Sequence, residues 1–406
     1  MKKIMIILFV LFNTGLFAQD IIIKSLKVHT NVDGNSIPVL TSAKEFLIID
    51  FDVQSEYPPN FNIIFKFCDR NWNPEDNIFL LNQGQNTAFN LDYFTLPTTV
   101  EDAKYHYSNR FPDKSGYVSF PFSGKWKFFI VDSQDPSLVF AEGKFFFVNA
   151  DQTFSVDVEK ETLDDKVYYP PQLGNVNWII AEANLKQDYF PFYVDELEII
   201  KNHLIDNAIS VFRNSTDQNR AFEWDGGSKV KFTAKDVRPG NEYRQVNLNN
   251  INVYNSKNVK AQFDGIEYNR FFIQGKKDLN GSFTLKSHKD VNSIYLNVTF
   301  QVKTPEEVYG DVYLVGAFNN WELSENYKMN FNGDFFEKNV ELKRGVYDYQ
   351  YVIVNGDVKN PANQDWFVLE GNDLATTNEY NIFLWYRDQE YGGYDRIIGY
   401  SKIQTR

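Results

Sequence analysis

The stretch that decides the fold is Asp311-Val-Tyr-Leu-Val-Gly-Ala-Phe-Asn-Asn-Trp321, which lies in the last quarter of a 406-residue chain. Two later segments answer it: Gly333-Asp-Phe-Phe336 and Gly345-Val-Tyr-Asp-Tyr-Gln-Tyr-Val-Ile-Val-Asn-Gly356. These segments are rich in β-branched and aromatic residues and are bounded by Asn, Asp and Gly, a pattern typical of short strands joined by tight turns. They predict a β-domain at this end of the chain.

The strand pattern extends over the rest of the sequence. The chain contains 37 Phe and 24 Tyr, residues that fit half-buried pleated surfaces. No sustained helical period is found over any useful window. The clearest expected strands are 45–53, 62–68, 124–131, 143–148, 176–183, 194–200, 229–233 and 291–300. We therefore predict an all-β protein of tandem immunoglobulin-like β-sandwich domains.

The chain length leaves room for three such domains, by the rough prior of one domain per about 100–200 residues. We expect a signal peptide over residues 1–18 and three sandwiches over residues 19–150, 151–288 and 289–406. The turn-rich segment Tyr168-Tyr-Pro-Pro171 lies within the second of these.

The first residues have the features of an export signal. Lys2 and Lys3 precede an apolar run from Ile4 to Phe12, and small or polar residues lead to Ala18. This arrangement is typical of a cleaved secretory signal peptide. No apolar run long enough to span a bilayer recurs, so direct membrane insertion is not expected. The single cysteine, Cys68, allows neither a lipid anchor after the signal nor an internal disulfide.

The charge balance bears on the possible partners. The chain has 54 acidic and 41 basic residues and a formal net charge of −13 at pH 7. Nucleic acid is not an expected partner, because phosphate binding needs concentrated Lys and Arg. The acidic balance is interpreted as serving solubility.

No constellation of residues predicts catalysis. The four histidines, His29, His106, His203 and His288, fall in separate segments and form no zinc pattern. The sequence has no nucleophile elbow and no phosphate-binding Gly-rich loop. Carboxylates such as Asp164-Asp165 and Glu306-Glu307 lie in polar turns and are interpreted as solvated. We therefore predict a protein that is not an enzyme, with no cofactor and no metal.

The opening segment resembles the glycogen-binding modules, the family-48 carbohydrate-binding domains. In their sugar-binding members, exposed tryptophans stack on pyranose rings, and Trp321 matches the first of these. A Lys is replaced here by Gln350, and a second Trp by Val358. A Leu-x-Thr-x-Asn element is matched by Leu374, Thr376 and Asn378. The resemblance implies the same fold and leaves an alternative function, a periplasmic or surface carbohydrate-binding protein that uses Trp321 and this element.

The whole chain resembles the plug protein family of the type 9 secretion system of Bacteroidetes. The elements that carry this resemblance are, in chain order, Phe67-Cys-Asp-Arg-Asn-Trp-Asn-Pro74, Tyr105-His-Tyr-Ser-Asn-Arg-Phe-Pro112, Ser123-Gly-Lys-Trp126, Phe222-Glu-Trp-Asp-Gly-Gly227, Asp236-Val-Arg-Pro-Gly-Asn-Glu-Tyr-Arg244, Gly316-Ala-Phe-Asn-Asn-Trp321 and Tyr386-Arg-Asp-Gln-Glu-Tyr-Gly-Gly-Tyr-Asp-Arg-Ile-Ile-Gly-Tyr400. The resemblance implies a periplasmic protein, peripheral to the outer membrane, that docks on the large β-barrel translocon and seals it while no substrate is in transit.

A plug of this kind acts through protein contact, and aromatic residues and Arg are enriched at protein interfaces. The candidates for contact with the translocon are Trp72, Trp321, Trp385, Tyr386 and Arg387.

Overall fold

The computed structural model describes residues 21–42, 44–163, 170–263, 265–306 and 309–405. The predicted signal peptide, 1–18, and the pair at 164–165 lie outside these residues. The described chain is all-β, as predicted, and forms six sheets. Its helical turns are all 3-10 and at most four residues long: Pro171–Gly174, Pro191–Tyr193, Ile205–Asn207, Ala317–Asn319, Glu325–Tyr327, Pro361–Asn363 and Glu390–Gly392.

The N-terminal sandwich consists of two sheets. One has the order β1 (Ile22–Thr30), β3 (Leu47–Gln54), β7 (Tyr105–Phe111), β6 (Tyr93–Thr95). The other has the order β2 (Val39–Leu40), β9 (Val139–Phe147), β8 (Gly124–Asp132), β4 (Phe61–Cys68), β5 (Thr87–Ala88). Alternate residues of both sheets face inward and fill one aromatic core, in which Phe51 stacks on Tyr107 with ring centroids 4.9 Å apart. Four of the expected strands, at 45–53, 62–68, 124–131 and 143–148, are confirmed here.

The middle sandwich also has two sheets around one core. Its first sheet has the order β10 (Ser155–Thr162), β11 (Asn175–Asn184), β15 (Lys229–Val237), β14 (Arg220–Trp224). Its second sheet has the order β13 (Ile209–Phe212), β12 (Val194–Lys201), β26 (Glu379–Asp388), β27 (Tyr394–Gln404). The last two strands of the chain therefore belong to this unit.

The third sandwich is built from the strands between β15 and β26. In its first sheet the central strand β24 (Gly345–Val354) pairs with β16 (Arg244–Asn247), β19 (Phe283–Leu285), β21 (Asp311–Gly316) and β25 (Gln364–Asp365). In the second, β20 (Tyr295–Lys303) pairs with β17 (Asn258–Lys260), β18 (Glu267–Tyr268) and β23 (Phe336–Lys343), and β22 (Asn330–Phe331) completes the edge. The segment at 311–321 supplies β21 and the turn that follows it.

The strand pairing groups the chain differently from the expected boundary at residue 288. Strands β16 to β19 precede that boundary, yet they pair with strands of the third sandwich, and β26 pairs with β12 of the middle one. The third sandwich is thus inserted into the middle one. Strands that follow one another in sequence are neighbours in a sheet only about two-thirds of the time. A boundary drawn from the order of strands in the sequence therefore cannot show that one sandwich is inserted into another.

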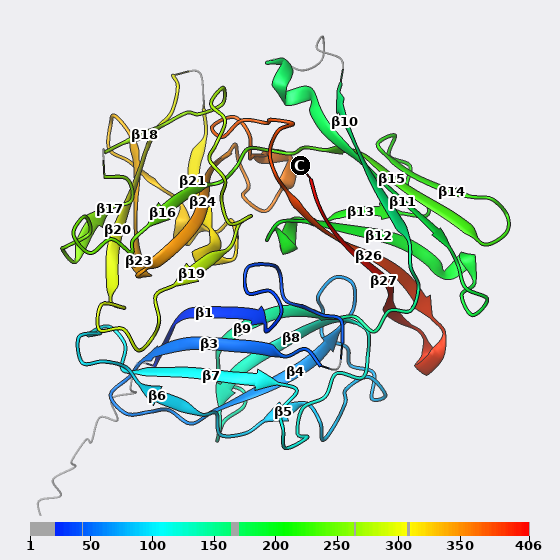
Figure 1. Cartoon of the computed structure of the whole chain (residues 1–406), viewed down its shortest axis with the longest axis horizontal. Coiled ribbons are helices and arrows are strands. Elements are labelled where there is room, and N and C mark those ends of the chain that lie inside the picture. The colour runs from blue at the N-terminus through cyan, green and yellow to red at the C-terminus, as the bar shows by residue number, and fades with distance from the viewer. Residues whose placement is uncertain (1–20, 43, 164–169, 264, 307–308, 406) are drawn as a thin grey trace, which may run out of the picture.

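Figure 1 shows the three sandwiches around a common centre: the N-terminal one in blue and cyan, the third in yellow and orange, and the middle one in green with β26 and β27 in red. Apolar clusters join the units pairwise, one between the N-terminal and middle sandwiches and one between the N-terminal and third sandwiches. Among the described residues, no helix has the length and apolar character needed to cross a membrane.

Candidate functional sites at the sandwich interfaces

The interface between the N-terminal and middle sandwiches is apolar with a buried ion pair at its centre. Phe146 of β9 stacks on Phe383 of β26, with ring centroids 4.4 Å apart. Lys125 Nζ lies 2.6 Å from Glu198 Oε1, and their side chains are only 3% and 4% exposed. Removing either partner of such a pair would leave a buried charge uncompensated, so the pair fixes how the two sandwiches dock.

Two tryptophans predicted to contact a partner protein lie in this same interface. Trp385 Nε1 donates a hydrogen bond of 3.1 Å to Glu198, and Lys125 Nζ lies over the rings of both Trp72 and Trp385, 4.9 and 5.4 Å from their centroids. Both rings are buried. They are interface residues, but the interface is internal.

A second ion network lies at the edge of this interface. The guanidinium of Arg70 contacts three carboxylates at the starts of two strands: Asp195 at 2.9 Å and Glu196 at 3.1 Å in β12, and Asp395 at 2.6 Å in β27. Burial opposes ionisation of Asp395, but the hydrogen bonds and charge of Arg70 hold the pKa of Asp395 below its ordinary value. Arg70 therefore ties the N-terminal sandwich to the start of β12 and to the β26–β27 hairpin.

The interface between the N-terminal and third sandwiches is centred on Asp52 of β3. Its carboxylate accepts hydrogen bonds from Lys343 Nζ at 2.6 Å, Tyr295 Oη at 2.7 Å and the ring Nδ1 of His106 at 2.7 Å. Burial alone would raise the pKa of Asp52, but the bonds from His106 and Lys343 keep it below its ordinary value. The Asp52 carboxylate thus bonds to side chains of both sandwiches at their interface.

Two histidines from separate segments meet at this interface. His106 and His288 stack with ring centroids 4.1 Å apart. Their separation in sequence gave no sign of this contact. The described residues hold no group of His, Cys, Asp and Glu able to bind a metal, so the pair is not part of such a site.

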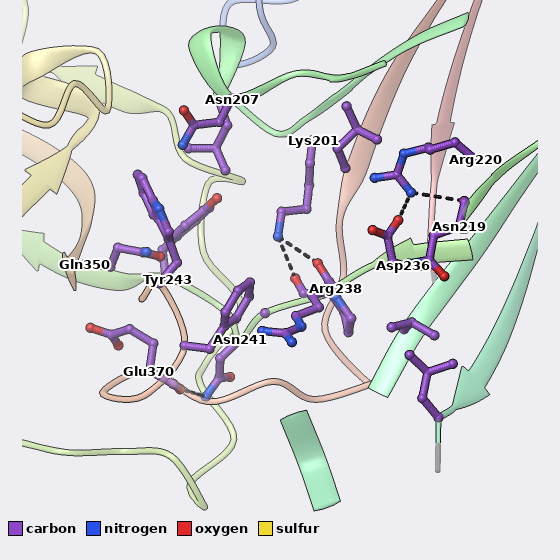
Figure 2. A pocket seen from close by; sticks show the side chains of 18 residues that line it. Lys201, Asn207, Asn219, Arg220, Asp236, Arg238, Asn241, Tyr243, Gln350 and Glu370 are labelled. Carbon is purple, nitrogen blue, oxygen red and sulfur yellow. Dashed lines mark hydrogen bonds and ion pairs between the residues drawn. The ribbon is translucent and has the colours of Figure 1, made fainter. Parts of the chain in front are cut away.

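The middle and third sandwiches line a cavity of about 400 Å³ where the chain passes from one to the other. Figure 2 shows Lys201 reaching toward the passing segment, with Tyr243 and Gln350 to one side and Arg220 and Asp236 to the other. Neither resemblance in the sequence assigns this cavity a role.

The remaining predicted contact residues differ in accessibility. Trp321 is buried: its ring packs on Tyr243, and its Nε1 donates a 2.8 Å hydrogen bond to the carbonyl of Gly281. Tyr386 is buried among tyrosines of the middle sandwich. Of the five candidates only Arg387 is exposed. The close pairing of β21 with β24 requires glycine at 316, since a Cβ there would lie 2.7 Å from the Asp348 carbonyl oxygen.

The predicted sugar contacts are engaged inside the molecule. Thr376 Oγ1 donates to the carbonyl of Gly240 at 2.9 Å, and Asn378 Nδ2 donates to the carbonyl of Pro239 at 3.0 Å. Both side chains are buried, and Leu374 is partly buried. In this structure the Leu-x-Thr-x-Asn element and Trp321 hold the passage between two sandwiches, so they are not available to a polysaccharide. That the third sandwich is a glycogen-binding-like module stays a prediction.

One protein-family model matches the N-terminal part of the chain. Residues 23–149 match the family model described as the type 9 secretion system plug protein 1st domain. This match covers the N-terminal sandwich and supports the plug family that the sequence motifs indicate. The model spans less than a third of the chain, so the similarity to this family is shown for the N-terminal sandwich, where it suggests a role in the type 9 secretion system.

The chain is also similar to solved structures. A crystal structure of a hypothetical protein from Parabacteroides merdae is 22% identical, with a TM-score of 0.75 over 95% of this chain and 99% of that one. At this identity the likeness shows the fold alone. A bacterial ice-binding adhesin structure, 10% identical over 94% of this chain and 96% of that one, has a TM-score of 0.14 and carries no argument. No curated protein matches the chain.

Proposed function

We propose that this protein is a non-enzymatic plug that docks on the periplasmic opening of the type 9 secretion translocon barrel and seals it when no substrate is in transit. The observation that carries the proposal is the family match over the N-terminal sandwich. The buried ion pairs at both interfaces of that sandwich support it, because a seal must resist deformation and such pairs are costly to separate.

We place the docking surface at the end of the molecule where the N-terminal sandwich meets the β26–β27 hairpin. Phe79 is 64% and Tyr391 46% exposed, and their rings stack with centroids 5.9 Å apart. Asn77 Nδ2 donates a 2.7 Å hydrogen bond to the Tyr391 carbonyl and so holds the two loops together. Arg387, the accessible contact candidate, lies in this hairpin one residue before the end of β26, where it pairs with Asp395 of β27. We call Phe79, Tyr391 and Arg387 the hairpin patch.

Exposed aromatic rings beside an Arg are the composition of interface hot spots. The patch is formed by residues of both the N-terminal and the middle sandwich. A partner would therefore bind it only when these two sandwiches are docked as they are in this structure. This property suits a seal.

The test is recovery of the translocon by the tagged protein. Pull-down from outer-membrane extracts should recover a very large β-barrel protein, and Phe79→Glu should abolish the recovery. Phe331→Glu is the matched control, since Phe331 is exposed on the third sandwich. Recovery of no barrel protein by the unmodified chain would overturn the proposal, and retention by a glycogen column would favour the carbohydrate-binding alternative instead.

A further inference from the structure

The sheets of this protein differ in how their edges are covered. Among the strands that end the six sheets of the described chain, three have more than six residues: β1, β10 and β27. β1 is interrupted by a bulge between Lys24 and Lys27, and both lysines bond to the third sandwich. β27 is covered by the segment before β10, because its Ile398 carbonyl accepts a 3.0 Å hydrogen bond from the backbone N–H of Gln152. Bulges and covering segments protect an edge from a further strand.

The edge of β10 has neither protection. All eight of its residues, Ser155–Thr162, pair with β11 without a register shift, and none is a proline. Within the described residues β11 is its one strand partner, so the backbone groups on its other side have no strand to bond. Figure 1 shows β10 reaching the upper margin of the molecule, away from the N-terminal sandwich. A long, unbroken edge of this kind is a template for the addition of another chain.

The two faces of β10 determine which chain fits beside it. Val156 and Val158 pack against the core of the middle sandwich, whereas Asp157, Glu159 and Glu161 alternate with them on the opposite face and are exposed. None of the three carboxylates forms an ion pair with another described residue. Opposite charges on neighbouring strands stabilise their pairing. The strand that fits therefore has apolar residues beside the two valines and Lys or Arg beside the three carboxylates.

A second copy of β10 does not meet this condition. If two β10 strands paired antiparallel with the valines of both copies on one face, acidic residues would lie opposite one another. In the register centred on Val158, for example, Asp157 of one copy lies opposite Glu159 of the other. Like charges directly opposite are destabilising. The acidic face thus acts against self-association at this edge and favours a basic partner.

We propose that the outer edge of β10 binds an extended polypeptide segment that alternates Lys or Arg with apolar residues. The segment adds a strand to the sheet β10–β11–β15–β14, and its backbone bonds to the outer side of β10. Its apolar residues extend the face of Val156 and Val158, and its cations pair with the three carboxylates. This binding uses no residue of the hairpin patch, so it is independent of the plug function.

The test uses the full chain and two eight-residue peptides with blocked ends, one that alternates lysine with valine and one that alternates glutamate with valine. In titration calorimetry the lysine–valine peptide should bind, and the glutamate–valine peptide should bind at least about tenfold more weakly, a difference of 1.4 kcal/mol. Hydrogen exchange should slow over residues 155–162 when the lysine–valine peptide is bound, because its backbone covers the outward N–H groups. Exchange over residues 220–224 of β14, at the other edge of the same sheet, should not change.

A charge reversal separates strand addition from attraction to the acidic chain as a whole. Glu159→Lys should weaken the lysine–valine peptide about three- to fivefold and strengthen the glutamate–valine peptide. Glu223→Lys makes the same change at an exposed site of β14 and should leave both affinities unchanged. Melting temperatures check that both variants are folded. No binding of the lysine–valine peptide at about 1 mM, equal weakening in the two variants, or binding without slower exchange over residues 155–162 would overturn the proposal.

Discussion

The two interfaces of the N-terminal sandwich each bury a carboxylate, and they differ in the groups that donate hydrogen bonds to it. Toward the middle sandwich, Glu198 accepts from Lys125 and from one tryptophan, amid stacked aromatic rings. Toward the third sandwich, Asp52 accepts from a lysine, a tyrosine and a histidine, and that histidine stacks on another. Glu198 thus has one charged donor and one neutral one, whereas Asp52 has three donors, one of which is a histidine.

Lys125→Met should have the largest effect. It leaves Glu198 buried with Trp385 as its remaining side-chain donor, so the free energy of unfolding should fall by about 3–5 kcal/mol. Urea denaturation followed by tryptophan fluorescence measures this, because Trp72 and Trp385 lie at the interface. Lys114→Met, at an exposed site of the same sandwich, is the control. An equal loss in both variants would mean that the interface does not depend on this pair.

A chemical probe can show that the first interface is the one that opens. Cys68 lies opposite Lys125 in the β4–β8 ladder, is buried, and has a pKa raised to about 12, mainly by burial. Its thiol should react very slowly with iodoacetamide in the unmodified chain. Faster reaction in Lys125→Met would place the disruption at this interface.

Lys343→Met should cost less. His106 and Tyr295 still donate to Asp52 after the lysine is removed, so we expect a loss of about 1–3 kcal/mol. The same denaturation experiment measures it, and the reactivity of Cys68 should not change. If Lys343→Met lowered the free energy of unfolding as much as Lys125→Met does, the remaining donors, His106 and Tyr295, would not be stabilising Asp52.

The sequence predicted the sandwiches well and their assembly poorly, for one physical reason. In β8, Trp126 and Phe128 point into the core, and alternation leaves Lys125 on the other face. A lysine at this position predicts that the outer face of β8 is exposed to solvent. The actual neighbour is another sandwich, and the only signal was that charged Glu196 and Glu198 alternate on β12 with the apolar residues of its core. Complementary charges on two outer faces do not reveal which faces meet.

The same reason explains the fate of the predicted contact residues. Phe383 and Trp385 lie on the outer face of β26, whose inner face is filled by Ile382 and Leu384. An apolar outer face correctly indicates an interface. Since β26 was expected at the end of a separate domain, the sequence could not show that the partner is the chain itself.

The smallest effect should come from the stacked histidines. Burial and the charges of His106, Lys343 and Lys289, opposed by Asp52, lower the pKa of His288 below its ordinary value of about 6.5. The unfolded chain therefore takes up a proton on His288 at a higher pH than the folded chain does. The contribution to stability is complete above about pH 6.5 and is lost as the pH falls below it. His288→Phe keeps a stacked ring and removes the titration, so the melting temperature should fall less between pH 7 and pH 5. Part of the slope remains, because His203, which bonds the Asn35 carbonyl, also has a pKa lowered by burial. An unchanged slope would mean that the second interface does not sense pH through this pair, and the contrast between the two interfaces would then rest on their donors alone.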